Sequence, residues 1–161
     1  MNAQQIIKKF NLETHPEGGY FKETYRSELV AVPEGFKSER NYSTSIYFLI
    51  TNEAFSAFHK VNQDEIWHFY IGSCIHLHLI HPNGKYELIK VGNQITDGEV
   101  PQFVVPAQTW FAAEVVEEHQ FAFVGCTVSP GFDFKDFELA NREALTSKFP
   151  NHKNTIKRLT R

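Results

Sequence analysis

The chain has 161 residues, of which 42% are hydrophobic and 22% charged, and its formal net charge is −3 at pH 7. This composition predicts one globular domain with a substantial core and excludes an intrinsically disordered chain. Because basic residues form no stripe and no apolar run reaches the roughly 20 residues that cross a bilayer, we expect no nucleic acid and no membrane among its partners.

The N-terminal segment predicts a short amphipathic helix over about residues 3–11, where Ile6, Ile7 and Phe10 recur at helical spacing. This segment lacks the apolar region and small-residue cleavage site of a signal peptide. The only two cysteines, Cys74 and Cys126, lie far apart in apolar stretches. They predict buried, reduced thiols, and hence a cytoplasmic protein.

The remainder of the chain has the pattern of an all-β sandwich or barrel, in which short apolar runs alternate with turn signals. Residues 30–41 read as a loop, Asn83-Gly84 predicts a hairpin, and residues 135–149 have the composition of an outer helix. The basic tail that follows predicts a frayed, solvated terminus. Strands are expected at residues 20–26, 44–51, 54–60, 65–71, 75–81, 86–91, 102–105, 110–115 and 120–128.

The alternation of side chains along a strand predicts a buried polar pair. Glu65 shares one face with Trp67, Phe69 and Ile71, so an apolar interior on that face also buries the carboxylate. The turn that precedes it can return the chain so that His59 lies beside Glu65. Such a pair suits a general base or two metal ligands, and a purely structural hydrogen-bonded pair stays equally open.

The spacing of His59, Val61, Glu65 and Gly72 resembles the first metal-binding motif of the cupin superfamily. Two positions depart from it, because Glu53 stands for the first glycine and Val61 for the second histidine. The segment that begins at Pro106 resembles the second cupin motif, with Gln108 in place of its glycine and Phe111 in place of its histidine. Only two of the four cupin metal ligands therefore remain.

Longer segments resemble one cupin family, Cupin_5 (DUF985), in order from about Leu12 to Glu138. They are "HPEGGYFKETYRS", "STSIYFLI", "FHKVNQDEIWHFYIG", "VPAQTWFAAE" and "VGCTVSPGFDFKDFE". The resemblance implies a cupin-type double-stranded β-helix (a jelly-roll barrel), a homodimer and a pocket open at one end. We expect a single domain over residues 1–161, with the barrel at about 12–135 and a helical segment at about 136–161. The resemblance implies no particular reaction.

The reduced ligand set predicts a pocket without a metal or other cofactor. If a divalent metal is present, His59 and Glu65 hold it, and Cys126 or His119 is a further donor. His76 and His78 share a strand face opposite Ile75, Leu77 and Leu79, so they are expected outside the barrel or in a subunit interface.

The segment from His15 to Arg26 predicts a lining for the pocket. Two adjacent glycines let the backbone approach another group closely, and a terminal arginine suits a carboxylate or phosphate. A structural turn that leads into an ordinary edge strand is the alternative. The substrate-binding residues expected here and near the barrel mouth are Glu17, Gly18, Gly19, Phe21, Arg26, Trp67, Trp110 and Phe111.

These features together predict a metal-independent isomerase or epimerase that acts on a small polar molecule, sugar-like or oxoacid-like. The chain resembles metal-free cupin-like epimerases, which use a histidine base and a tyrosine acid across a barrel. Here His59, oriented by Glu65, is the expected base, Tyr47 or Tyr25 the acid, and Arg26 the anchor of an anionic end. A non-catalytic small-molecule binding protein and a metal-dependent enzyme are the alternatives.

Overall fold

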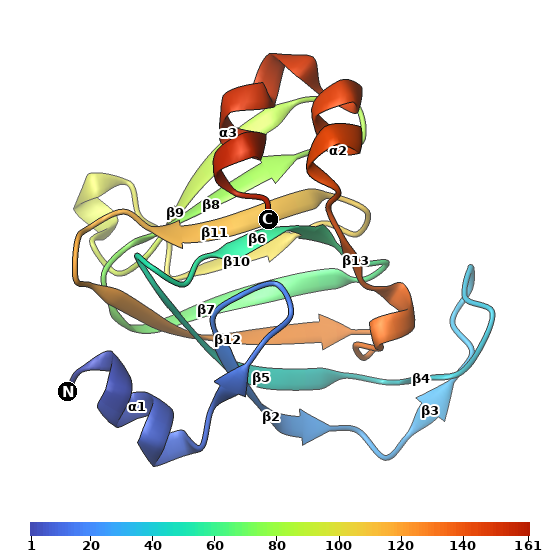
Figure 1. Ribbon diagram of the computed structural model, residues 1–161. Helices are drawn as coiled ribbons and strands as arrows, with labels where there is room; N and C mark the ends of the chain where they lie inside the picture. The colour runs from blue at the N-terminus through green and yellow to red at the C-terminus, as the bar shows by residue number, and fades with distance from the viewer.

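The computed structural model describes residues 1–161 and consists of two facing antiparallel sheets with helices at both ends of the chain (Figure 1). The six-stranded sheet has the order β1-β2-β5-β12-β7-β10, and the five-stranded sheet has the order β13-β6-β11-β8-β9. A separate ribbon pairs β3 with β4. These facing sheets confirm the predicted all-β barrel.

The strands are β1 (Glu13–Thr14), β2 (Tyr20–Arg26), β3 (Val30–Ala31), β4 (Arg40–Asn41), β5 (Thr44–Thr51), β6 (Ser56–Lys60), β7 (Asp64–Gly72), β8 (Ile75–Ile80), β9 (Tyr86–Val91), β10 (Gln102–Val105), β11 (Trp110–Val115), β12 (Phe121–Ser129) and β13 (Glu138–Leu139). The α-helices are α1 (Ala3–Phe10), α2 (Arg142–Lys148) and α3 (Lys153–Arg158), and the 3₁₀ helices are η1 (Ile95–Asp97), η2 (Phe134–Asp136) and η3 (Pro150–His152).

The main core lies between the two sheets, where alternate residues of each strand point inward. Trp67 on β7 and Leu77 and Leu79 on β8 are fully buried there, as the strand alternation predicts. Ile71 departs from this prediction and is exposed, because the register of β7 against β12 shifts after Phe69. The prediction that alternate residues of β7 point inward therefore holds as far as Phe69 and fails at Ile71.

Helix α1 covers part of the outer face of the six-stranded sheet, below and to the left in Figure 1. Its start is a capping box, in which the Asn2 side chain accepts from the backbone of Gln5 and the Gln5 side chain accepts from that of Asn2. Its apolar side buries Ile6 against Leu49 and Phe123. Both faces of β5 are therefore apolar, one toward the core and one toward α1.

Helices α2 and α3 close the outer face of the five-stranded sheet, at the top of Figure 1. Ile156 and Leu159 are buried there, and the Leu159 carbonyl accepts from the backbone N–H of Phe58 at 2.8 Å. The expectation of a solvated tail is therefore wrong. His78 lies on the outer face of β8, as predicted, and is buried there between Tyr86 and Glu114.

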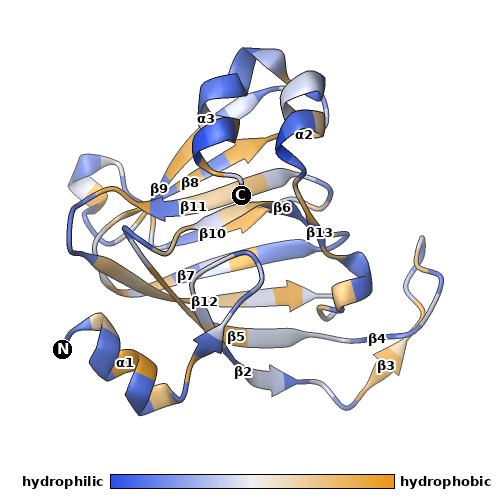
Figure 2. Ribbon diagram, in the orientation of Figure 1, coloured by the Kyte–Doolittle hydropathy of each residue, from blue (hydrophilic) through white to orange (hydrophobic).

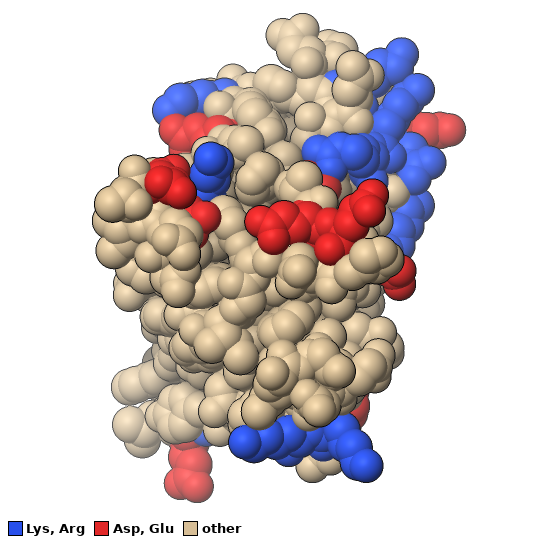
Figure 3. Space-filling view, turned by 90° about the vertical axis from the view of Figure 1, so that its left-hand side faces the viewer, with Lys and Arg blue, Asp and Glu red and all other residues tan.

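Figure 2 shows that apolar residues concentrate on the strands. The helices near the two ends of the chain, α1 on one side and α2 and α3 on the other, pack onto the sheets. On the face drawn in Figure 3, acidic and basic side chains are interspersed around a broad area that carries neither. No helix is both long enough and apolar enough to cross a membrane.

Candidate active site

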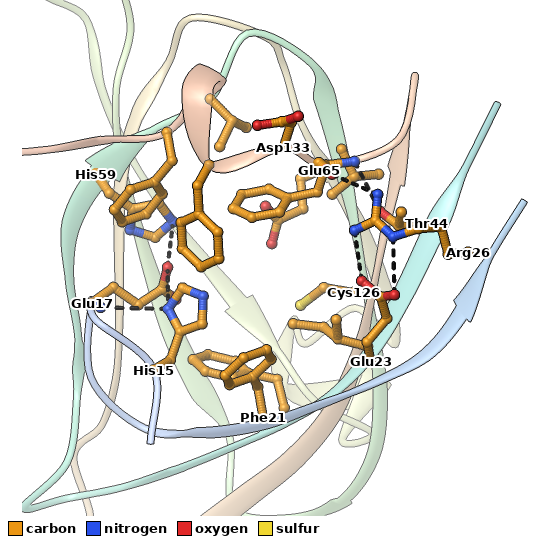
Figure 4. Close-up of a pocket in the computed structure, with 17 residues that line it drawn as sticks. His15, Glu17, Phe21, Glu23, Arg26, Thr44, His59, Glu65, Cys126 and Asp133 are labelled. Carbon is orange, nitrogen blue, oxygen red and sulfur yellow. Dashed lines mark hydrogen bonds and ion pairs between the residues drawn. The ribbon is translucent and has the colours of Figure 1, made fainter. Parts of the chain in front are cut away.

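A cavity of about 350 Å³ opens at the end of the barrel where β2 ends and β5 begins. Its volume lies at the lower end of the range for small-molecule pockets. The wall combines apolar and aromatic side chains with several ionisable ones (Figure 4). The lining residues are His15, Glu17, Phe21, Glu23, Arg26, Thr44, Ile46, Phe48, His59, Val61, Glu65, Cys126, Val128, Phe132, Asp133, Phe134 and Phe137.

A tight turn between β1 and β2 brings Glu17 to this wall. Gly18 and Gly19 both have positive φ, and a Cβ on Gly19 would lie 2.8 Å from the carbonyl oxygen of Leu49. The Ala57 backbone N–H donates to the Glu17 carbonyl at 2.8 Å, which fixes the turn against β6. The glycines thus serve close packing of the backbone, and the carboxylate beside them reaches the cavity.

Glu17 and His59 form a buried dyad. Nε2 of His59 lies 3.2 Å from Oε2 of Glu17, and the Ser56 hydroxyl donates to Oε1 at 2.8 Å. Nδ1 of His59 lies 2.7 Å from the Ala57 carbonyl oxygen. Because a carbonyl only accepts, Nδ1 carries a proton, and Nε2 is the nitrogen that gains or loses one.

The environment leaves this dyad without a proton between its two members. Burial lowers the pKa of His59, despite the opposing charge of Glu17, and so favours the neutral imidazole. Burial alone would raise the pKa of Glu17, but His59, His15 and the Ser56 hydroxyl outweigh it, and the net pKa is lowered. An ionised carboxylate thus faces an unprotonated nitrogen, so both groups are free to act as proton acceptors at pH 7.

His15 is the third polar group on this side of the cavity, to the left in Figure 4. Its Nδ1 lies 3.3 Å from Oε2 of Glu17 and 3.4 Å from the Glu17 backbone nitrogen, so its tautomer decides whether it donates or accepts. Its ring packs edge-on against Phe21, with the centroids 4.7 Å apart. His15 therefore positions the carboxylate from the side opposite His59.

Glu65 behaves differently from Glu17, although both carboxyls are buried on the same cavity wall. Burial, reinforced by the negative charge of Glu17, raises the pKa of Glu65 to about 8. The neighbouring Cys126 thiol and Trp67 indole act weakly in the opposite direction, and the Trp67 Nε1–H forms no hydrogen bond of acceptable geometry. Glu65 is therefore a neutral acid at pH 7 with a proton to donate.

The expected His59–Glu65 pair is corrected by this geometry. Both residues line the cavity, but the carboxylate in contact with His59 is Glu17. Glu17 arrives from a loop distant in sequence, so the strand alternation that placed Glu65 inside could not identify it. A buried carboxylate therefore still accompanies the histidine, from a different part of the chain.

Arg26 lines the cavity, but its guanidinium is already engaged. Nε and Nη2 donate to the two carboxylate oxygens of Glu23 at 3.0 and 2.7 Å. Nη1 donates to Asn41 and to the Phe132 carbonyl oxygen at 2.8 and 3.1 Å. Arg26 therefore holds the rim of the cavity together, and its role as an anchor for an anionic substrate stays a prediction.

The two tyrosines expected as acids lie outside the cavity lining. Tyr47 points to the outer face of β5, where its ring lies 5.0 Å from Phe10 and 5.3 Å from Phe123. Tyr25 is 54% exposed on β2. Neither can deliver a proton to a molecule bound beside His59, so the acid role falls to another group.

Five residues expected to bind substrate lie behind or away from the wall, and one of them is Phe111, which is fully buried against His59. Trp67 is fully buried in the core against Phe48, with the ring centroids 5.8 Å apart. Trp110 faces the opposite side of its sheet, toward α2 and α3. Gly18 and Gly19 pack against backbone, as described above. Of the expected set, Glu17, Phe21 and Arg26 do line the cavity.

The residues at the cupin metal positions do not fit a four-ligand metal centre. Val61 is buried, and the Phe111 ring packs directly on the His59 ring with the centroids 4.1 Å apart. Gln108 keeps a left-handed backbone, φ 64°, where the cupin motif has glycine. No group of three His, Cys, Asp or Glu side chains is arranged to hold a metal ion. The cupin backbone is retained, and two of its four ligand positions, those of Val61 and Phe111, carry apolar side chains.

Several lining residues were not identified from the sequence. His15 and Glu23 lie within the segment from His15 to Arg26 that was predicted to line the pocket, but they were not among the residues expected to bind substrate. Asp133 and the phenylalanines on either side of it belong to the "SPGFDF" turn, which reads equally well as a hydrophobic plug. Only their convergence in three dimensions separates the two interpretations.

The two facing antiparallel sheets around one terminal cavity define a cupin-type double-stranded β-helix. The chain matches the family Cupin_5, described as Cupin superfamily (DUF985), over residues 4–140. It is 36% identical over 148 residues to the uncharacterized protein YML079W of Saccharomyces cerevisiae, covering 84% of this chain and 73% of that one. The chain therefore belongs to the Cupin_5 family.

Solved structures agree with this assignment. A hypothetical protein from Leishmania major has a TM-score of 0.94 at 33% identity, covering 99% of both chains. Protein SO0799 from Shewanella oneidensis has a TM-score of 0.91 at 39% identity, covering 100% of this chain and 98% of that one. Oxalate decarboxylase from Bacillus subtilis, at 18% identity and a TM-score of 0.56, covers 91% of this chain and 36% of its own and shares the fold alone.

Proposed function

We propose that the protein is a metal-independent enzyme that moves a proton within a small polar molecule, as an isomerase or epimerase does. The cupin fold supports small-molecule binding, and the observation that carries the proposal is a proton-accepting dyad and a proton-donating carboxyl in one cavity. Groups whose environments push their pKa values in opposite directions mark the acid and the base of such a site.

The chemistry follows from the two protonation states. The Glu17–His59 dyad takes a proton from the carbon next to a carbonyl, and the proton is then shared between Nε2 and Oε2. Glu65 donates its proton to the carbonyl oxygen as negative charge develops there. The dyad then returns a proton to carbon, at the same or the neighbouring position. Glu65 takes back the proton of the hydroxyl group, which completes the cycle without a cofactor.

The experiment is solvent exchange at carbon. Native mass spectrometry of freshly purified protein identifies any co-purified ligand, and that ligand, together with a panel of sugars and oxoacids, is incubated with the protein in D₂O. We expect wild-type protein to incorporate deuterium next to the carbonyl of its substrate. His59→Gln and Glu17→Gln should each slow incorporation by about 10²–10⁴-fold, the usual contribution of a positioned base.

His81→Gln is the matched control, because His81 also pairs with a glutamate, Glu87, but lies outside the cavity. It should exchange at the wild-type rate. Exchange that is equally fast in all four proteins would overturn the proposal. Binding without any exchange would favour the non-catalytic binding protein, and stoichiometric metal in protein purified without chelator would favour the metal-dependent alternative.

We also propose a homodimer in the cytoplasm. Two free cysteines suit a reducing compartment. The outer face of the six-stranded sheet exposes Tyr70 and Val104, which are 46% and 43% exposed, and a twofold dimer is the commonest oligomer. Sedimentation of wild-type protein and of Tyr70→Glu tests this, with a monomer expected for the variant.

A further inference from the structure

The wall of the cavity carries more negative than positive groups. Its carboxyls are Glu17, Glu23, Glu65 and Asp133, its one permanent cation is Arg26, and it has no lysine. As described above, four hydrogen bonds to residues of the protein already engage the Arg26 guanidinium. A carboxylate or phosphate on a ligand would therefore find no free cation and would face the carboxylates of Glu17 and Asp133.

The rim contains Asp133 and its two chain neighbours, Phe132 and Phe134, and all three residues line the cavity. The two phenyl rings lie edge-to-face with their centroids 5.1 Å apart. Asp133 is half-buried, accepts a hydrogen bond from the Lys135 backbone at 2.8 Å and forms no ion pair at contact distance. A carboxylate and aromatic rings that line the same cavity attract ammonium groups, the first through charge and the rings through cation–π attraction.

This rim is held in place before any ligand arrives. The Phe132 carbonyl accepts from Arg26, and the Phe132 backbone N–H donates to the Thr44 hydroxyl at 2.9 Å. Asp133 caps η2 through the Lys135 backbone, which fixes the direction of its carboxylate. A preorganised rim loses little conformational entropy when a cation binds.

Deeper in the cavity, Glu65 is more than nine-tenths buried and faces the cavity, with the Cys126 thiol and the Trp67 indole among the side chains near its carboxyl. A carboxyl that faces a small-molecule cavity can also reach a polar group of the ligand. A protonated carboxyl both donates and accepts, and it therefore suits a hydroxyl or carbonyl oxygen.

We infer that the cavity selects small molecules with a protonated amino group at one end, bound between Asp133 and the rings of Phe132 and Phe134, and an oxygen function at the other, bound to Glu65. The ligand class is thus an amino alcohol, amino sugar or amino ketone, and it is not an anion. The inference rests on the proposed function for the choice of cavity and adds the substrate class.

Three probes share a cyclohexanol ring and differ in the substituent at position 4, which is an amine, a hydroxyl or a carboxylate: 4-aminocyclohexanol, cyclohexane-1,4-diol and 4-hydroxycyclohexanecarboxylate. Their dissociation constants are measured by ligand-observed NMR at pH 7. We expect the amine to bind about tenfold more tightly than the diol, and the carboxylate to bind more weakly than the diol. Equal binding of the diol or carboxylate, or no binding of the amine at about 10 mM, would overturn the inference.

Variants locate the effect. Asp133→Asn should reduce the amine's advantage over the diol to about twofold, whereas Asp97→Asn, an exposed acid outside the cavity, should leave it unchanged. Glu23→Gln removes the partner of Arg26 and should strengthen binding of the carboxylate probe. An amine preference that survives Asp133→Asn in folded protein contradicts the proposed position.

These measurements need no turnover. Selective amine binding without deuterium exchange at carbon would support the ligand class and contradict the catalytic proposal. Exchange in an anionic substrate would support the catalytic proposal and contradict the ligand class.

Discussion

Two buried glutamates on one wall have opposite pKa shifts because their neighbours differ. Glu17 receives hydrogen bonds and faces two imidazoles, whereas Glu65 has apolar surroundings and the charge of Glu17 nearby. The folded-state pKa of Glu65, about 8, lies above its ordinary value. The folded protein therefore holds this proton more tightly than the unfolded chain between about pH 4.5 and 8.

The sign of the resulting effect on stability is fixed. Glu65 contributes stability that is fully present below its unfolded pKa and is lost as the pH rises through its folded pKa. In Glu65→Gln, that loss is absent. Between pH 5 and 9 the variant should gain on wild type by up to the order of 4 kcal/mol in the free energy of unfolding, measured by urea denaturation.

Glu28→Gln serves as the control, because Glu28 is exposed and forms no ion pair. Its difference from wild type should not change with pH over this range. A Glu65→Gln protein whose stability runs parallel to wild type throughout would show that Glu65 is ionised in the cavity, and the acid role assigned to it would fail.

At the scale of elements, the segment from Phe132 to Phe137 forms one side of the cavity and is anchored from beneath by Asp136. Arg40 donates to both Asp136 oxygens at 2.6 and 2.8 Å, and Gln63 adds a third hydrogen bond at 2.6 Å. The guanidinium beside it holds the pKa of Asp136 below its usual value. The buried pair thus ties β4 and the β6–β7 turn to the cavity rim.

Asp136→Ala should destabilise the protein by about 3–5 kcal/mol, because it leaves the buried guanidinium of Arg40 without a counter-charge. Equilibrium denaturation measures the loss. The double variant Arg40→Met/Asp136→Leu replaces both charges with apolar groups and should recover part of it. A single variant as stable as wild type would mean that water or another acid reaches Arg40.

Helix α3 is short, yet its side chains complete a second core on the outer face of the five-stranded sheet. Ile156→Ala should cost about 2–4 kcal/mol in the free energy of unfolding, the range for removing a buried aliphatic side chain. Lys157→Ala, at the exposed neighbouring position, should change it by less than about 0.5 kcal/mol. Equal effects of the two variants would indicate that α3 is not packed in solution.

At the scale of the whole molecule, strand periodicity and turn residues predicted the barrel, and most strand limits agree within two residues. The same reasoning placed His59 and Glu65 on an inner face. It failed for Tyr47 and Trp110, because β5 and β11 are buried on both faces, by the core on one and by helices on the other. Hydrophobicity then no longer distinguishes inside from outside.

The contact between Glu17 and His59 was beyond prediction for a different reason. It depends on how a glycine turn folds against β6, which local propensity does not encode, and no alternation relates the two residues. The burial of the C-terminal tail was not predicted, because its few apolar residues, Ile156 and Leu159, are separated by polar ones. The polar residues cover only the exposed side of α3, and the two apolar residues on its other side are buried. Both the Glu17–His59 contact and the burial of the tail depend on how distant parts of the chain pack together, which the local sequence does not encode.

The strand that carries His59 lies between early and late parts of the chain. Leu139 on β13 pairs with His59, the Ala140 N–H donates to the Phe58 carbonyl, and the Phe58 N–H donates to Leu159. During synthesis, β6 leaves the ribosome about a hundred residues before Leu159 does. His59, the proposed base, therefore acquires its backbone partner on β13 late in synthesis, and a chain arrested near residue 135 would contain every lining residue except Phe137 without the strand that borders this histidine.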